Sequence, residues 1–136
     1  MAKVLLCCST CHTIALAWFV LSKLPEIDTS QIERNHETIH AMQWMEVVII
    51  TGLIIFVVDL VLGISAWWYL ISGVFYYVMY VVEWLCKLPF GNAYKSISFE
   101  QEAYENDDNN NYVENRHLVT GWLKKVFKVV KEPTKL

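Results

Sequence analysis

Apolar residues in this chain are gathered into two long stretches. The longer stretch, residues 47–86, contains only two charged side chains, Asp59 and Glu83. A helix that crosses a bilayer needs about 20 predominantly apolar residues. The stretch is therefore long enough for two crossings rather than one.

Near the middle of this stretch lies the small, flexible sequence Gly63-Ile64-Ser65, which favours a turn. We therefore predict a two-helix membrane hairpin over residues 47–87. Its helices should cover about residues 44–62 and 66–87. Asp59 would then lie about one turn from the end of the first helix, where headgroups and water can solvate it.

The second apolar stretch covers residues 1–24, between Lys3 and Lys23. We predict an N-terminal apolar helix here, either a marginal third crossing or an interfacial segment. A cleaved signal peptide is disfavoured because no small-x-small pattern follows the apolar core before Pro25.

The segment between the two stretches is polar and predicts a helix of its own. Ser30 followed by Glu33 matches a capping box, in which the two side chains satisfy backbone amides of the first turn. A helix should therefore start near Gln31 within the segment 25–46 and continue into the first membrane span.

Composition supports a membrane protein of one domain, residues 1–136. Of its 136 residues, 55% are apolar and only 18% are charged, which is unusual for a small soluble protein. The predicted fold class is all-α, with helices packed together at the membrane interface.

In the C-terminal part, residues 118–131, Trp122, Val126 and Val129 fall on one helical face, and the opposite arc holds Lys124, Lys125, Lys128 and Lys131. This pattern predicts a basic amphipathic helix that lies on anionic membrane lipids. Nucleic acid is a poor partner because the net charge of the chain is −3. Lysines near membrane ends favour the cytoplasmic side, so we expect the polar segments to face the cytoplasm.

The polar helix carries His36-Glu37-Thr38-Ile39-His40, which reads H-E-x-x-H. Residues i and i+4 share one face of a helix, so both imidazoles can reach one tetrahedral zinc ion. The alternative is a pair of surface histidines that flank an exposed acid. A third ligand would favour the zinc site.

Candidates for the third ligand are Glu100, Glu102 and Glu105 in the segment 93–116. Two crossings return the chain to its starting side, so these acids can approach the histidines. Glu100 is favoured because Ala103 shares its helical face and allows close packing. Glu102 is the alternative, and Glu105 is third.

Such a site would leave one zinc position open for water, which is typical of catalytic zinc. Glu37 would then act as general base. Tyr104, Tyr112, Arg116 or His117 could stabilise a developing oxyanion, and we place Tyr104 with Glu37 as catalytic candidates.

Two further polar residues, Gln43 and Glu46, follow the histidines on the same predicted helix. They are candidates for contacts behind the ligands. An ordinary polar stripe facing the headgroups explains them equally well.

A competing motif lies near the N-terminus, where Cys8-Ser9-Thr10-Cys11-His12 reads C-x-x-C-H. This is the pattern for covalent attachment of c-type haem. Attachment requires export of the motif, yet the motif begins only eight residues into the chain, within an apolar segment. A haem carrier therefore ranks third among the hypotheses.

H-E-x-x-H followed by a downstream glutamate resembles the gluzincin metallopeptidases. Glu100-Gln101-Glu102-Ala103 is similar to the E-x-x-A-D third-ligand motif of their membrane-bound branch, in which a helical hairpin separates the two motifs. Tyr104 replaces the aspartate, so the carboxylate that the family uses to orient a histidine is missing at that position.

The chain also resembles small, uncharacterised membrane proteins of Bacteroidetes-type bacteria over about residues 32–128. The matching elements are residues 35–40 with Gln43 and Glu46, then 83–85, then 93–106, then 112–113 with Arg116. The apolar stretch is longer in this chain. The resemblance implies a zinc peptidase in a bacterial inner membrane, with peptides or membrane-protein segments as substrates. The alternative is a non-catalytic membrane scaffold or assembly protein with a structural or vestigial metal site.

Overall fold

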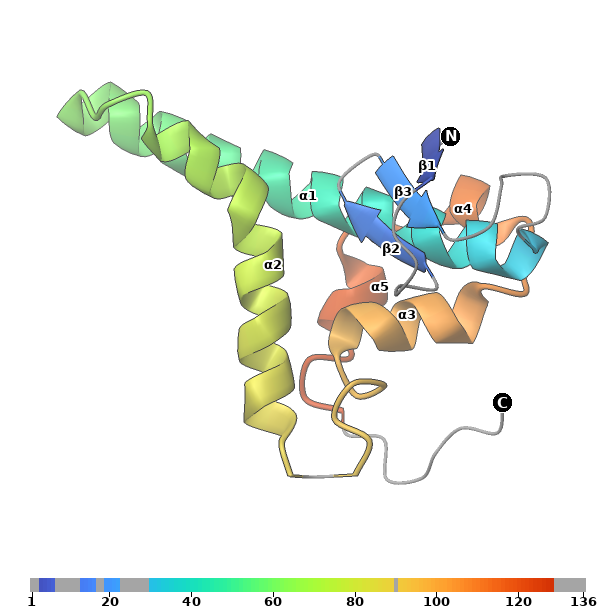
Figure 1. Cartoon of the computed structure of the whole chain (residues 1–136). Helices are drawn as coiled ribbons and strands as arrows, with labels where there is room; N and C mark the ends of the chain where they lie inside the picture. Colours follow the sequence, from blue (N-terminus) through green and yellow to red (C-terminus); the bar gives the residue numbers. More distant parts are fainter. Residues whose placement is uncertain (1–2, 7–12, 17–18, 23–29, 90, 129–136) are drawn as a thin grey trace.

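The computed structural model describes residues 3–6, 13–16, 19–22, 30–89 and 91–128 (Figure 1). In these residues the helices are α1 (Gln31–Leu62), α2 (Trp68–Lys87), α3 (Ser98–Asn106), α4 (Tyr112–Asn115) and α5 (Thr120–Leu123). The strands are β1 (Lys3–Leu6), β2 (Thr13–Leu16) and β3 (Phe19–Ser22). The C-x-x-C-H motif at 8–12 lies outside the described residues.

Helix α1 begins and ends where the sequence predicts. The Ser30 hydroxyl accepts a hydrogen bond from the Glu33 amide at 3.2 Å, and the Glu33 carboxylate accepts from the Ser30 amide at 3.0 Å. Gly63 ends the helix at φ 59°, ψ 48°, a left-handed conformation in which a side chain would be strained. The predicted capping box and turn are thus confirmed.

Both α1 and α2 are long and apolar enough to cross a membrane. Their apolar side chains face outward, as Leu53 (60% exposed) and Leu60 (71% exposed) illustrate. The hairpin projects from the other elements (Figure 1). Within it, the Tyr69 hydroxyl donates to Asp59 at 3.0 Å and the Trp44 indole donates to the Gly73 carbonyl at 3.0 Å.

Helix α3 lies along the polar half of α1, residues 31–46 (Figure 1). A buried apolar cluster fixes α3, α1, α2 and the C-terminal segment together, and its members are Val47, Tyr76, Ile97, Phe99 and Trp122. Phe99 is fully buried and contacts the Tyr76 ring at 4.7 Å and the Trp122 ring at 4.8 Å. This packing sets the position of α3 against the histidine helix.

The predicted N-terminal apolar helix is wrong for the described residues. They form a three-stranded sheet of order β1-β3-β2, with β1 parallel and β2 antiparallel to β3. The strands contain Val4, Thr13, Ile14 and Val20, and β-branched residues favour strands over helices. The all-α class therefore holds only from residue 30 onward.

The predicted amphipathic helix over 118–131 is also replaced, within the described residues, by a shorter element. Helix α5 covers only Thr120–Leu123, and turns follow it. Trp122 is 5% exposed and its indole donates to Glu46 at 3.0 Å. The tryptophan expected to face lipid therefore lies in the protein core, because a buried carboxylate binds its N–H group. Residues 129–131 lie outside the described residues.

Candidate metal centre

Two elements bring three ligand-type side chains together. His36 and His40 lie one turn apart on α1, and Glu100 lies in the first turn of α3. A ligand atom from each residue lies within 4.8 Å of the others. The favoured third ligand from the sequence is therefore the one that meets the histidines.

The distances between these atoms suit a small tetrahedral ion. The two Nε2 atoms are 3.1 Å apart, His36 Nε2 lies 3.5 Å from Glu100 Oε2, and His40 Nε2 lies 3.4 Å from Glu100 Oε1. Zinc bonds to nitrogen and oxygen of about 2.0–2.1 Å give a tetrahedron with edges of roughly 3.3–3.4 Å. The nitrogen–nitrogen separation is close to this value. The two nitrogen–oxygen separations involve different oxygens of Glu100, and one ligand atom from each residue lies within 4.8 Å of the others.

The hydrogen bonds of Gln43 determine which nitrogen of His40 carries a proton. The Gln43 NH₂ group donates to the Phe99 carbonyl and to Glu102 Oε2, both at 3.0 Å. Its oxygen therefore faces His40 Nδ1 at 2.8 Å. Because that oxygen can only accept, Nδ1 carries the proton and Nε2 of the neutral ring presents a lone pair.

His36 is oriented in the same way by a residue that the sequence analysis missed. Its Nδ1 lies 3.4 Å from Asp107 Oδ2, so this nitrogen donates and Nε2 faces the other ligands with a lone pair. An aspartate carboxylate therefore contacts His36 from position 107, at the C-terminal end of α3. Tyr104 instead packs its ring edge against His36, with a centroid distance of 4.6 Å.

Glu100 is an ionised carboxylate in a buried place. It is 2% exposed, and the Tyr80 hydroxyl donates to its Oε1 at 2.6 Å. Burial raises its pKa, but hydrogen bonds from His36 and His40, formed when the facing nitrogen of either ring is protonated, outweigh burial and lower the pKa below the usual range. Oε2 is buried without a hydrogen-bond partner. A buried anion that faces two lone pairs fits a bound cation.

The charge of Glu100 also acts on His40. Burial lowers the pKa of His40, but hydrogen bonding and charge attraction from Glu100 outweigh it, and the pKa is raised. A proton and a metal ion would therefore compete for Nε2 of His40, beside the negative charge of Glu100.

Glu37 lies between the two histidines in sequence and is 8% exposed. Burial raises the pKa of its carboxyl group, against the opposing charges of His40 and His36. A carboxyl group with a raised pKa, next to a metal site, is suited to accept a proton from water near neutral pH.

The alternative ligand, Glu102, points elsewhere. It is 0% exposed, and its oxygens accept from Arg116 Nε at 2.5 Å, Tyr112 at 2.9 Å and Gln43 at 3.0 Å. Arg116 and Tyr112, two of the oxyanion candidates, are thereby engaged with Glu102. Glu105 lies at the surface, where Lys125 binds it.

No protein-family model, curated protein or solved structure matches this chain. The geometry of the three side chains and of their partners therefore carries the functional argument.

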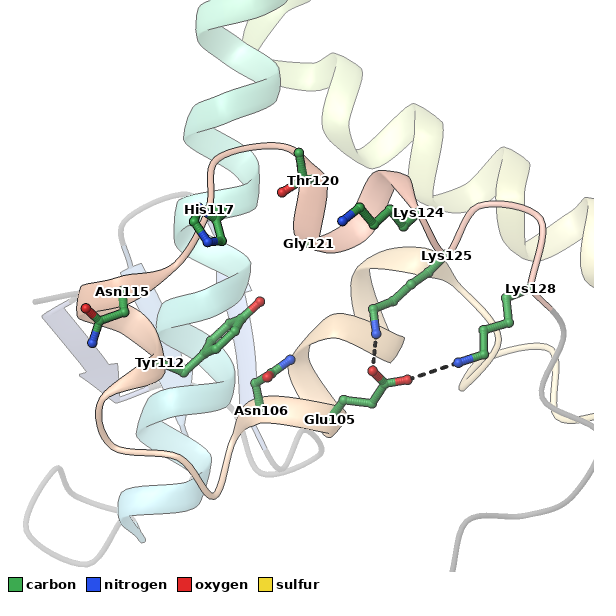
Figure 2. A pocket seen from close by; sticks show the side chains of 10 residues that line it. All are labelled: Glu105, Asn106, Tyr112, Asn115, His117, Thr120, Gly121, Lys124, Lys125 and Lys128. Atoms are coloured by element: carbon green, nitrogen blue, oxygen red, sulfur yellow. Dashed lines mark hydrogen bonds and ion pairs between the residues drawn. The ribbon is translucent and has the colours of Figure 1, made fainter.

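A pocket of about 400 Å³ lies between α3 and the C-terminal segment (Figure 2). Its lining includes His117 and Tyr112 but not His36, His40 or Glu100. Lys125 and Lys128 both reach Glu105 there (Figure 2). His117, the remaining oxyanion candidate, thus belongs to a different surface from the three converging ligands.

Proposed function

We propose that this chain is a membrane-anchored zinc metallopeptidase of gluzincin type. One observation carries the proposal. Two imidazole nitrogens and a buried carboxylate, one oxygen of which has no hydrogen-bond partner, offer ligand atoms within 4.8 Å of one another, which supports binding of one zinc ion between them. The acid at position 37 adds the proton acceptor that a purely structural site does not need.

His36, His40 and Glu100 would hold the ion. Zinc bound there supplies Lewis-acid polarisation of a carbonyl group and lowers the pKa of water. Glu37 takes a proton from the attacking water and delivers it to the leaving amine. Tyr104, which is 41% exposed beside His36, would donate a hydrogen bond to the oxygen of the scissile carbonyl.

The two apolar helices would anchor this chemistry next to a membrane. In Figure 1 the polar half of α1 and α3 lie away from the tip at which α1 passes into α2. We infer that the substrates are peptides or membrane-protein segments near the cytoplasmic face of a bacterial inner membrane. The lysines of the C-terminal segment support this orientation.

The metal centre is tested by metal analysis of detergent-purified protein. About one zinc per chain is expected for a three-ligand site. His36→Ala, His40→Ala and Glu100→Gln should each lose the metal while retaining helical circular dichroism. His117→Ala is the matched control, because this histidine is outside the centre. Metal-free wild-type protein after zinc exposure would overturn the proposal.

A second function is favoured by the burial of the centre. Glu100 is 2% exposed and His40 is 7% exposed, and closed sites are typical of structural zinc. In that case the chain is a non-catalytic membrane protein whose metal holds α1 and α3 together.

Glu37→Gln separates the two functions, because it removes the base and leaves the ligands. For a peptidase, zinc should stay bound while hydrolysis of a diverse peptide mixture falls by about 100-fold or more. Zinc-loaded wild-type protein that cleaves none of these peptides would favour the structural role.

A further inference from the structure

Behind the proposed metal centre lies a second buried polar cluster, formed by α1, α3 and the C-terminal segment. Its members are Gln43, Glu46, Glu102, Tyr112, Arg116 and Trp122. The side chains of Arg116 and Glu102 are both 0% exposed. Burial of such a cluster is costly unless each group is paired.

The cluster is joined to a proposed ligand through one amide group. Gln43 donates to Glu102 Oε2 and accepts from His40 Nδ1. If this amide were reversed, its oxygen would face the Glu102 carboxylate and the Phe99 carbonyl. All three groups accept hydrogen bonds, so none of these contacts could form. Its NH₂ group would also face His40 Nδ1 and require that nitrogen to accept. Glu102 thus selects the orientation of the amide.

Arg116 in turn keeps Glu102 in place. Its Nε and Nη2 donate to the two oxygens of Glu102 at 2.5 and 3.0 Å. Glu46 accepts from a second edge of the guanidinium group, from Nη1 and from Nη2, the latter at 3.2 Å. The planar guanidinium group is suited to hold two carboxylates in fixed positions.

Without Gln43 and without a metal, the surroundings of His40 favour the opposite tautomer, because Nδ1 then faces the Tyr76 hydroxyl, 3.3 Å away, which can donate to an unprotonated nitrogen. A proton on Nε2 could be donated to the lone pair of His36, 3.1 Å away, or to Glu100, 3.4 Å away. The hydrogen bond to Gln43 opposes this and keeps the proton on Nδ1.

We propose that Glu102 and Arg116 are positioning residues that act through Gln43 to keep Nε2 of His40 free for a metal ion. This role rests on the proposed metal centre, but the tautomer of His40 can be measured in the metal-free protein. It explains why a chain with a metal-ligand motif also buries two carboxylates and an arginine one layer behind it.

The test measures the tautomer of His40 by ¹⁵N NMR of the imidazoles in metal-free protein, above the pKa of the ring. Wild-type His40 should carry its proton on Nδ1. Gln43→Met removes the amide at similar volume, and Glu102→Gln places a second NH₂ group in the cluster. Both variants should move the proton to Nε2. Glu105→Gln is the control, since it alters a surface carboxylate of the same helix.

Zinc titration completes the test. The two cluster variants should bind zinc about 10–100-fold more weakly than wild type, the usual cost of losing a partner behind a ligand, and Glu105→Gln should not. Wild-type His40 protonated on Nε2, or folded cluster variants that keep the wild-type tautomer, would overturn the inference. If instead the tautomers change as expected and wild type binds no zinc, only the proposed function fails.

Discussion

At the residue scale, Gly121 determines how closely the C-terminal segment approaches Glu102. A Cβ atom at this position would lie 2.1 Å from Glu102 Oε1 and 2.4 Å from its carboxyl carbon. Glu102 cannot move aside easily, because Arg116 and Tyr112 hold its oxygens.

Gly121→Ala should therefore destabilise the protein, although alanine normally stabilises a helix by about 1 kcal/mol relative to glycine. Gly52→Ala in α1 is the matched control, because nothing lies within 4 Å of its added Cβ. Thermal unfolding in detergent measures both. Equal melting temperatures for the two variants would show that Glu102 is not held against Gly121.

Glu105 makes a pH-dependent contact with the C-terminal segment. Burial raises the pKa of its carboxyl group, but hydrogen bonding and charge attraction from Lys125, together with Lys128, outweigh burial and lower it. A folded-state pKa below the unfolded value gives stability that is present above the unfolded pKa, 4.5, and is lost as the pH falls through the folded value.

The hydrogen-exchange protection factors of residues 120–128, which correct for the intrinsic pH dependence of exchange, should therefore fall at acidic pH. Glu105→Gln should remove that part of the pH dependence. The effect should be small, about 0.2–1 kcal/mol, because the pair is half exposed. A profile of Glu105→Gln that matches wild type would contradict the contact.

The convergence of the three proposed ligands could be predicted from sequence, but the partners that contact them mostly could not. His36 and His40 are related by helical periodicity, and Glu100 follows from the return of the chain through a hairpin. Asp107 lies 71 positions from His36, in a polar run with no periodicity to place it. Arg116 was weighed as an oxyanion donor, and only the packed structure shows that two carboxylates surround it.

At the scale of elements, the capping box of α1 holds the turn that precedes the metal centre. Ser30→Ala removes the hydroxyl that accepts from the Glu33 amide and should cost about 0.5–2 kcal/mol of stability. Ser30→Asp, whose carboxylate can accept the same hydrogen bond, should retain most of it. Denaturant unfolding of the two variants provides the measurement, and equal losses would show that the cap is not the cause.

Elements with strong local signals were predicted well, and elements set by distant contacts were not. The start of α1 and the turn at Gly63 follow from capping and turn chemistry. The strands near the N-terminus pair residues far apart, such as Lys3 with Phe19, and an apolar run alone does not distinguish a helix from strands. The place of Trp122 in the core depends in the same way on a distant partner, because its indole donates to Glu46, 76 positions away.

At the scale of the whole molecule, the centre depends on the hairpin. Helix α1 carries the histidines in its polar half and continues into its apolar half without a break. Helix α2 then returns the chain so that α3 can place Glu100 beside the histidines. The same pair of helices that is apolar enough to cross a membrane thus also brings Glu100 to the histidines. If the pair inserts into lipid, a fault in insertion should also affect the proposed metal centre.

Leu53→Lys tests whether the apolar half of α1 lies in hydrocarbon. Leu53 is 60% exposed, so in water a lysine there should change stability by at most about 0.5 kcal/mol. Within a bilayer the same lysine costs about 2.5–3.5 kcal/mol near the centre of a span. We therefore expect this variant to leave the membrane fraction and to lose bound zinc as well.

Ile32→Lys is the control, because Ile32 lies in the polar half of the same helix and is 52% exposed. It should remain in the membrane fraction, as measured by resistance to alkaline carbonate extraction. If Leu53→Lys stays in the membrane like the control, the hairpin does not span hydrocarbon. The metal centre would then have to be explained as that of a soluble protein, since the contacts among His36, His40 and Glu100 do not themselves require lipid.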